Sequence, residues 1–305
     1  MKLGFRRMTV LMGVLALVAA GCGGDNPPAD GDGSAAGTGV CATYDQNAGD
    51  LLAQICKNNE IRVSTDPAYP PQSELNAETG KYEGFDIDVA AEIAKRLGVA
   101  PPAWETPDWE VLTAGSWNDR WDMSVGSMTP IAERQKVLDF TEPYSFVPAV
   151  VVVHEDSTVT DIATDLDGKK IGVCSDCTYQ FFLEKTLEIP GFEFNFVIDD
   201  AKVQGYDTDT TALQDLALGN GTRLDAVLTS VTTAEAFAKD NPVKIVGDPI
   251  FGEPLAIAFD KSSGLDDTSL LDAVDKIVAD MHADGTLTEL SKKWYGGIDV
   301  TNVAA

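Results

Sequence analysis

The residues best suited to bind a small charged molecule lie in two separate parts of the chain. Arg134 comes after a polar turn that contains Ser127 and Thr129, and Thr178 opens a predicted helix directly after a strand. A guanidinium is a planar fork that binds a carboxylate through two hydrogen bonds, and a helix start offers free N–H groups to an anion. These residues predict a site for a small carboxylate. The alternatives are a surface Arg134 paired with a neighbouring acidic residue and an ordinary N-cap at Thr178.

The elements that must position these residues alternate between strands and helices. Short apolar runs predict strands over 61–64 and 122–125, and apolar residues at helical spacing predict a helix that ends before Gly98. A second unit of the same kind comprises two strands and two helices, over 170–173, 178–185, 211–218 and 224–228. The sequence therefore predicts an α/β fold with layered sheets.

Two apolar stretches far apart in the chain, 149–153 and 255–259, are predicted to be crossover strands between two lobes. The segment between them contains the second α/β unit. Predicted amphipathic helices around Val274 and Leu290 then return the chain to the first lobe. The chain is long enough for two lobes that each bury a core.

The first residues have the layout of a bacterial export signal. Lys2, Arg6 and Arg7 precede an apolar stretch that is short for a membrane span and ends at Ala19-Ala20-Gly21-Cys22. That ending resembles a lipobox, so 1–21 is predicted to be a lipoprotein signal peptide and Cys22 the lipid-modified residue. Residues 22–40 have little to bury and are predicted to form a flexible tether. Secretion without a lipid and a buried N-terminal helix are the alternatives.

Composition argues against several classes of function. The chain has 49 acidic and 22 basic residues, a formal net charge of −27, which opposes binding to nucleic acid. No Gly-rich Lys-Ser/Thr loop is present to bind a nucleotide. The two histidines, His154 and His282, lie far apart, and Asp207-Thr208-Asp209 lacks the Gly and the late Glu of a calcium loop. No cofactor and no metal site are predicted.

Four cysteines remain once Cys22 is assigned to the lipid. They allow three pairings, of which local closure favours Cys41 with Cys56 and Cys174 with Cys177. Disulfides fit a protein exported from the cytosol. A redox pair or two free thiols are the alternatives for Cys174 and Cys177.

Five segments together resemble a known family. They are 65–71, 84–89, 126–134, 139–144 and 283–296, and they include Gly84-Phe85-Asp86-Ile87-Asp88-Val89 and Lys293-Trp294-Tyr295-Gly296. In this order they are similar to family 3 of the bacterial extracellular solute-binding proteins, the polar amino-acid binders of ABC importers. The resemblance covers nearly all of 57–297.

The resemblance implies a periplasmic-binding-protein type II fold, in which two lobes joined by two strands close over a ligand. The expected limits are 41–148 and 254–305 for the first lobe and 149–253 for the second. It also implies a monomer outside the cytoplasmic membrane that delivers an amino-acid-like ligand to a permease. The ATPase of that importer is expected to be a separate chain.

The resemblance gives the polar residues individual roles. Arg134 and Thr178 hold the ligand's α-carboxylate, Tyr69 and Trp109 form apolar walls, and Asp66 faces the distal polar group. Tyr69 and Trp109 are core residues on the alternative interpretation. The expected ligand-binding set is Asp66, Tyr69, Trp109, Gly126, Ser127, Thr129, Arg134, Asp176, Cys177, Thr178 and Ser230.

One position departs from the family. Relatives usually have an acidic residue for the ligand's α-ammonium where this chain has Ser230, and a hydroxyl cannot neutralise a cation. We expect Asp176, in the unusual Cys-Ser-Asp-Cys segment, to supply the missing charge, unless the ligand's amine is modified or absent.

Two other functions are compatible with the same fold. One is a periplasmic enzyme that resembles cyclohexadienyl dehydratase, with a carboxylate such as Asp176 as acid or base. The other is a sensor domain, which we expect to continue into a transmembrane helix, whereas this chain ends at Ala305. For a binding protein, a carboxylate at Asp66 favours a basic or neutral polar amino acid over an acidic one.

Overall fold

The computed structural model describes residues 39–302. The predicted signal peptide 1–21, the lipidation site Cys22 and nearly all of the predicted tether 22–40 lie outside the described residues and stay predictions. No helix of the described part is long and apolar enough to cross a membrane.

The larger sheet joins strands from both ends of the chain. Its order is β10-β9-β11-β8-β12-β6-β1-β5, and β7 pairs with β12. The strand bounds along the chain are β1 (Arg62–Ser64), β5 (Ala103–Glu105), β6 (Met123–Met128), β7 (Leu138–Phe140), β8 (Ser145–His154), β9 (Lys170–Cys174), β10 (Lys202–Tyr206), β11 (Ala226–Ser230) and β12 (Val243–Asp260). A smaller antiparallel sheet contains β2 (Ala68–Tyr69), β3 (Ser73–Leu75) and β4 (Tyr82–Glu83).

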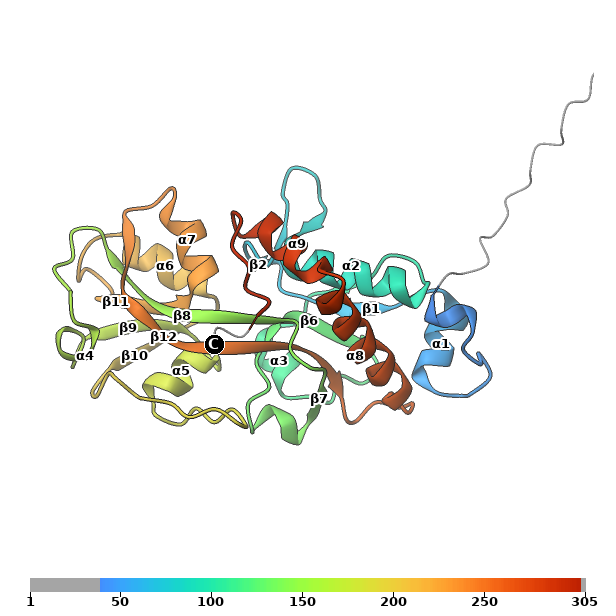
Figure 1. Ribbon diagram of the computed structural model, residues 1–305. Coiled ribbons are helices and arrows are strands. Elements are labelled where there is room, and N and C mark those ends of the chain that lie inside the picture. The colour runs from blue at the N-terminus through green and yellow to red at the C-terminus, as the bar shows by residue number, and fades with distance from the viewer. Residues whose placement is uncertain (1–38, 303–305) are drawn as a thin grey trace, which may run out of the picture. The chain divides into compact units, whose positions relative to one another are not determined.

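Strands β8 and β12 connect two lobes, as predicted (Figure 1). They pair antiparallel from Val243 opposite His154 to Leu255 opposite Ser145, with a register shift between Val246 and Phe251. The first half of β12 and β8 belong with β11 and β9 in lobe two, whereas the last residues of β12 pair with β6 and β7 in lobe one. Val150–Val153 of β8 are buried because both faces of this strand are covered.

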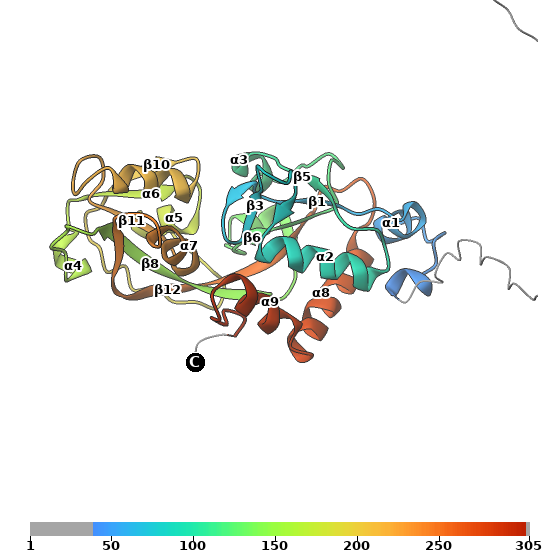
Figure 2. The ribbon, with the colours of Figure 1, turned by 90° about the horizontal axis from the view of Figure 1, so that it is seen from above.

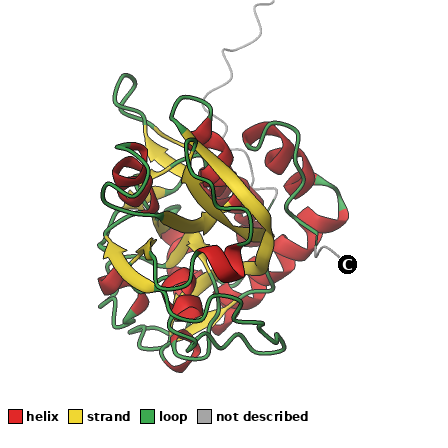
Figure 3. Ribbon diagram, turned by 90° about the vertical axis from the view of Figure 1, so that its left-hand side faces the viewer, coloured by secondary structure: helices red, strands yellow, loops and turns green. Residues whose placement is uncertain are grey.

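Helices lie on either side of the strands in both lobes (Figures 2 and 3). Lobe one has α1 (Leu51–Asn58), α2 (Phe85–Leu97), α3 (Trp109–Thr113), α8 (Thr268–Ala283), α9 (Thr286–Trp294) and the 3-10 turns η1 (Val40–Ala42) and η2 (Arg134–Lys136). Lobe two has α4 (Ile162–Asp165), α5 (Thr178–Leu183), α6 (Asp209–Ala217) and α7 (Val231–Ala238). These elements confirm the predicted α/β fold with two crossover strands. The predicted lobe limits at 149 and 254 stay a proposal.

Each lobe has its own core. In lobe one, the apolar stripe of α2 packs against β1, β6 and the helices α8 and α9. The helix ends where Gly98 takes a left-handed φ of 84°. The backbone of Gly39 packs so closely on Gly98 that a side chain at Gly39 would collide with it. The described chain therefore enters the protein at the C-terminal end of α2, in lobe one.

The two predicted disulfides are confirmed. Cys41–Cys56 ties η1 to α1, and Cys174–Cys177 ties the end of β9 to the residue before α5. The first bridge closes a segment of lobe one. The second constrains the loop that contains Ser175 and Asp176.

A buried carboxylate supports the end of β6. Asp86, in the first turn of α2, is fully buried and accepts hydrogen bonds from Ser127 Oγ at 2.8 Å and from Tyr144 Oη at 2.9 Å. Tyr144 Oη in turn accepts from the backbone N–H of Ser127 at 3.0 Å. Burial, partly offset by the hydrogen bonds from Ser127 and Tyr144, raises the pKa of Asp86 to about 7. Asp86 therefore positions Ser127, which adopts a positive φ of 53°.

Replacing Asp86 with Asn is expected to flatten the pH dependence of stability. Because the pKa of Asp86 is raised in the folded state, the folded protein binds this proton more tightly than the unfolded chain does. The stability that results is present below about pH 4 and is lost as pH rises to about 7. In urea titrations between about pH 4 and pH 7, the unfolding free energy of the wild type should decrease with rising pH by up to about 1.4 kcal/mol per pH unit more than that of Asp86→Asn does. Asp272→Asn, on the exposed side of α8, controls for the lost charge; equal slopes in Asp86→Asn and wild type would contradict the prediction.

Candidate functional site

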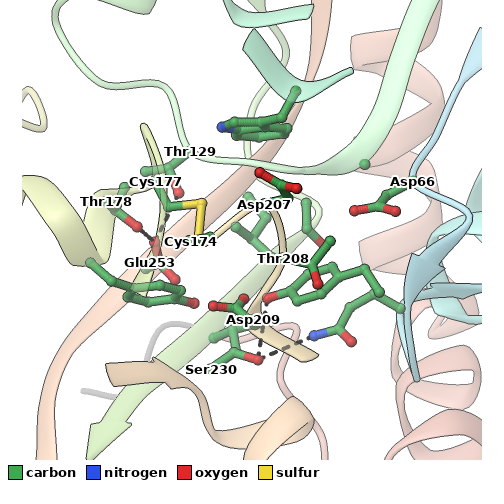
Figure 4. A pocket seen from close by; sticks show the side chains of 18 of the residues that line it. Asp66, Thr129, Cys174, Cys177, Thr178, Asp207, Thr208, Asp209, Ser230 and Glu253 are labelled. Carbon is green, nitrogen blue, oxygen red and sulfur yellow. Dashed lines mark hydrogen bonds between the residues drawn. A yellow bond between two sulfur atoms is a disulfide. The ribbon is translucent and has the colours of Figure 1, made fainter. Parts of the chain in front are cut away.

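A cavity lies between the two lobes, where β6, the end of β9, the start of α6 and β12 converge (Figure 4). Its volume is about 70 Å³, against roughly 10–15 Å³ needed by one water. We call it the inner cavity. Ten of the residues predicted from the sequence line it, namely Asp66, Tyr69, Trp109, Gly126, Ser127, Thr129, Arg134, Cys177, Thr178 and Ser230.

Arg134 contacts both lobes. Its side chain is 4% exposed, Nη1 donates to the carbonyl of Thr129 at 3.0 Å, and Nη2 donates to the carbonyl of Asp176 at 2.7 Å. The guanidinium lies over the ring of Trp109 at 4.9 Å. Burial, partly offset by the charges of Glu253 and Asp176, lowers the pKa of Arg134 to about 10, so it stays charged at neutral pH. Two carbonyls use two of its five donors, which leaves donors for an anion.

Asp176 lies outside the inner cavity. Its side chain is exposed beside a second space, and only its backbone carbonyl reaches lobe one, where Arg134 and the indole N–H of Trp109 donate to it. The left-handed φ of 57° at Asp176 turns this carbonyl toward lobe one. The predicted role of the Asp176 carboxylate stays a prediction.

Glu253 accepts hydrogen bonds from two hydroxyl groups, those of Thr129 and Thr178, that are predicted from the sequence to bind a ligand. It is 4% exposed on β12, and one of its oxygens accepts from the hydroxyls of both Thr178 and Thr129. Burial raises its pKa, and hydrogen bonds from Thr178, Tyr179 and Thr129 offset part of the rise. A second anion that binds here must therefore share these hydroxyls with Glu253 or rely on Arg134.

Ser230 takes part in contacts between the lobes. Its hydroxyl caps α7 by accepting from the N–H of Thr233 at 3.2 Å. Tyr69 Oη of lobe one lies 3.4 Å from it, and Gln72 Nε2 donates to Thr232 at 2.8 Å. These contacts join the small sheet of lobe one to the start of α7 and hold the lobes together around the inner cavity.

Several lining residues were missed by sequence reasoning, namely Gln72, Tyr179, Asp207, Thr208, Asp209 and Glu253. Asp209 is 3% exposed, and burial followed by the charge of Glu253 raises its pKa to about 7. The sequence does hold one signal for Glu253, because a charged residue just before the apolar run 255–259 of a predicted crossover strand is expected to lie between the lobes. Asp209 is the last residue of Asp207-Thr208-Asp209, which was weighed only as a calcium-binding loop and rejected.

Comparisons with known proteins identify similar sequences and structures. Residues 61–297 match the model of "Bacterial extracellular solute-binding proteins, family 3". The L-cystine-binding protein TcyJ of Escherichia coli is 30% identical over 99% of this chain and 100% of its own length. The histidine-binding periplasmic protein of Salmonella typhimurium is 29% identical over 77% of this chain and 87% of its own. The crystal structure of the ancestral amino acid-binding protein AncCDT-1, a precursor of cyclohexadienyl dehydratase, has a TM-score of 0.68 at 28% identity and covers 80% of this chain and 99% of its own.

The Cys174–Cys177 disulfide is expected to hold the carbonyl of Asp176 against lobe one, because it closes a loop with only two residues inside. In the variant Cys174→Ser/Cys177→Ser, hydrogen exchange at the indole N–H of Trp109 should become at least about tenfold faster when measured by NMR.

The matched control is Cys41→Ser/Cys56→Ser, which removes the other bridge. The Cys41–Cys56 disulfide closes a 15-residue loop, so its loss should cost about 3 kcal/mol of stability. The hydrogen exchange of Trp109 should nevertheless stay as in wild type. Wild-type exchange in both variants would show that the disulfide does not position Asp176.

Proposed function

Since this chain belongs to family 3 of the bacterial extracellular solute-binding proteins, we propose that it captures a polar amino acid between its two lobes for delivery to an ABC importer. The observation that carries the proposal is the position of Arg134, buried between the lobes with donors left for a carboxylate. A bidentate guanidinium–carboxylate pair is strong where water is excluded.

Capture proceeds by closure of the lobes. Lobe one contributes Arg134, Tyr69 and Trp109, and lobe two contributes Thr178 and Ser230. Neither lobe alone surrounds a ligand, so a ligand that contacts both stabilises the closed form by its differential affinity. The strands β8 and β12 are the covalent connection about which the lobes move. The permease, with a separate ATPase, then recognises the closed protein.

The matches favour a binding protein over a dehydratase, because the near full-length relative TcyJ is named as a binding protein. The description of the family as extracellular supports a location outside the cytoplasmic membrane. We also propose that the protein is a monomer. We also keep the lipid anchor at Cys22 as part of the proposal.

The anchor predicts a change in partitioning. In the producing bacterium, wild-type protein should enter the detergent phase of a Triton X-114 extract, whereas Cys22→Ser should stay in the aqueous phase because it lacks the acyl chains. Aqueous wild-type protein would contradict lipidation and leave the binding function untouched.

The binding function predicts ligand-dependent stabilisation. Among the twenty common amino acids, at least one should raise the melting temperature of the purified chain, since a ligand that binds only the folded state stabilises it. Arg134→Ala should weaken binding of that amino acid at least about tenfold in calorimetric titrations, because it removes a charge-assisted hydrogen-bond pair.

Arg223→Ala is the matched control. Arg223 is largely exposed and pairs with Asp215 away from the inner cavity, so affinity should stay at the wild-type value. Failure of every amino acid to raise the melting temperature would contradict the proposed function, and wild-type affinity in Arg134→Ala would contradict the role of this residue.

A further inference from the structure

One buried carboxylate in the inner cavity has an oxygen without a partner. Asp209 opens α6 and is 3% exposed, and its Oδ1 has no hydrogen-bond partner within bonding geometry among residues 39–302, although the hydroxyls of Thr229 and Tyr69 lie near enough to lower the pKa of this carboxylate. Buried polar groups nearly always have a hydrogen-bond partner, and an unpaired buried charge costs several kcal/mol. The missing partner of Asp209 is therefore expected to come from the ligand that fills this cavity.

Asp209 and the uncharged Ser230 both line the inner cavity on the side of lobe two (Figure 4). The hydroxyl of Tyr69 is 3.4 Å from Ser230 Oγ, and burial together with the nearby charge of Asp209 raises the pKa of Tyr69 well above its usual value. Tyr69 thus borders both residues. Ser230 cannot neutralise a ligand's ammonium group. Among the lining carboxylates of lobe two, Asp207 is exposed and Glu253 already accepts from two hydroxyls, so Asp209 is the buried carboxylate best placed to do so.

Acidic residues outnumber basic residues in the lining of the inner cavity. Asp66, Asp207, Asp209 and Glu253 line it, and Arg134 is the one basic residue among its described lining residues. A ligand carboxylate bound to Arg134 uses that positive charge. A single ammonium group then leaves an excess of carboxylates around the ligand, whereas a second cation reduces it.

A second space continues from the inner cavity, and we call it the outer cavity. Its volume is about 510 Å³, and the two cavities share Asp66, Trp109, Asp207 and Thr208. Asp108, Glu110 and Asp176 also line the outer cavity, and no Lys or Arg is among its described lining residues. A side chain that extends past Asp66 therefore enters a space that favours a cation and opposes a second carboxylate.

We infer that Asp209 binds the α-ammonium group of the ligand, and that the ligand is an α-amino acid whose side chain ends in a second cation directed to the outer cavity. This inference rests on the proposed function, because it takes the carboxylate of the same ligand to be bound by Arg134. It separates this chain from its relative TcyJ, since the distal end of L-cystine would bring a second carboxylate together with its ammonium into the outer cavity, whereas L-arginine and L-lysine bring a cation alone.

The ligand class is tested with probes that differ in charge. L-Arginine and L-lysine should bind the purified chain in calorimetric titrations, and L-citrulline, which matches L-arginine in shape but lacks the cation, should bind at least about tenfold more weakly. Tighter binding of L-citrulline or L-cystine than of L-arginine and L-lysine would overturn the ligand class while the proposed function stands. If no amino acid binds, the proposed function fails and this inference fails with it.

The role of Asp209 is tested with Asp209→Asn and 5-guanidinopentanoic acid, which is L-arginine without its α-ammonium. The variant should bind L-arginine at least about tenfold more weakly than the wild type does, and its affinity for 5-guanidinopentanoic acid should be unchanged. This probe already lacks the ammonium group, so removing the carboxylate that would bind it costs nothing further. Equal weakening of both probes, or of neither, would overturn the assignment.

A stability readout separates a binding role from a structural one. At pH 8, above the pKa of about 7, Asp209→Asn removes a buried charge, so the ligand-free variant should melt at the wild-type temperature or higher while its L-arginine affinity falls. A lower melting temperature in the absence of ligand would assign Asp209 to the structure and overturn the inference. Asp215→Asn, on the same helix but bonded to Arg223 and Tyr206, is the matched control and should keep the wild-type affinity.

Discussion

The guanidinium of Arg134 has to stay charged at a point where both lobes exclude water. Burial alone favours its neutral form, and the carbonyls of Thr129 and Asp176, the ring of Trp109 and the charge of Glu253 compensate. One of these carbonyls belongs to each lobe. The same group that is available to an anion therefore also joins the lobes, so under the proposed function closure and recognition depend on one side chain.

The crossover strands allow this arrangement. Because β8 and β12 pair over most of their length, the lobes are connected by a ladder of backbone hydrogen bonds, whose register shift lies between Val246 and Phe251. Glu253 lies on β12 two residues after this shift, and it accepts hydrogen bonds from Thr129 of lobe one and Thr178 of lobe two. The connection between the lobes thus places a carboxylate inside the space that they enclose.

The fold was predictable because its evidence is local. Continuous apolar runs identified β8 and part of β12, helical spacing and Gly98 identified α2, and short separation identified both disulfides. Ser127, Thr129 and Arg134 could be named from the sequence as lining residues because they lie at the end of one strand, β6, or just after it. Asp209 was missed because the sequence predicts this helix only over 211–218, and the acidic run 207–209 before it was weighed as a calcium loop and rejected. Its burial results from contact between segments far apart in the chain, which no local pattern encodes, and the same holds for Gln72.

Gly39 meets the body of the protein against Gly98, at the far end of α2 from the inner cavity. The chain upstream of Gly39 is therefore joined to lobe one, just before the segment that the Cys41–Cys56 disulfide closes. Under the proposed function, lobe one is therefore the lobe joined to the upstream chain, and closure moves lobe two relative to it.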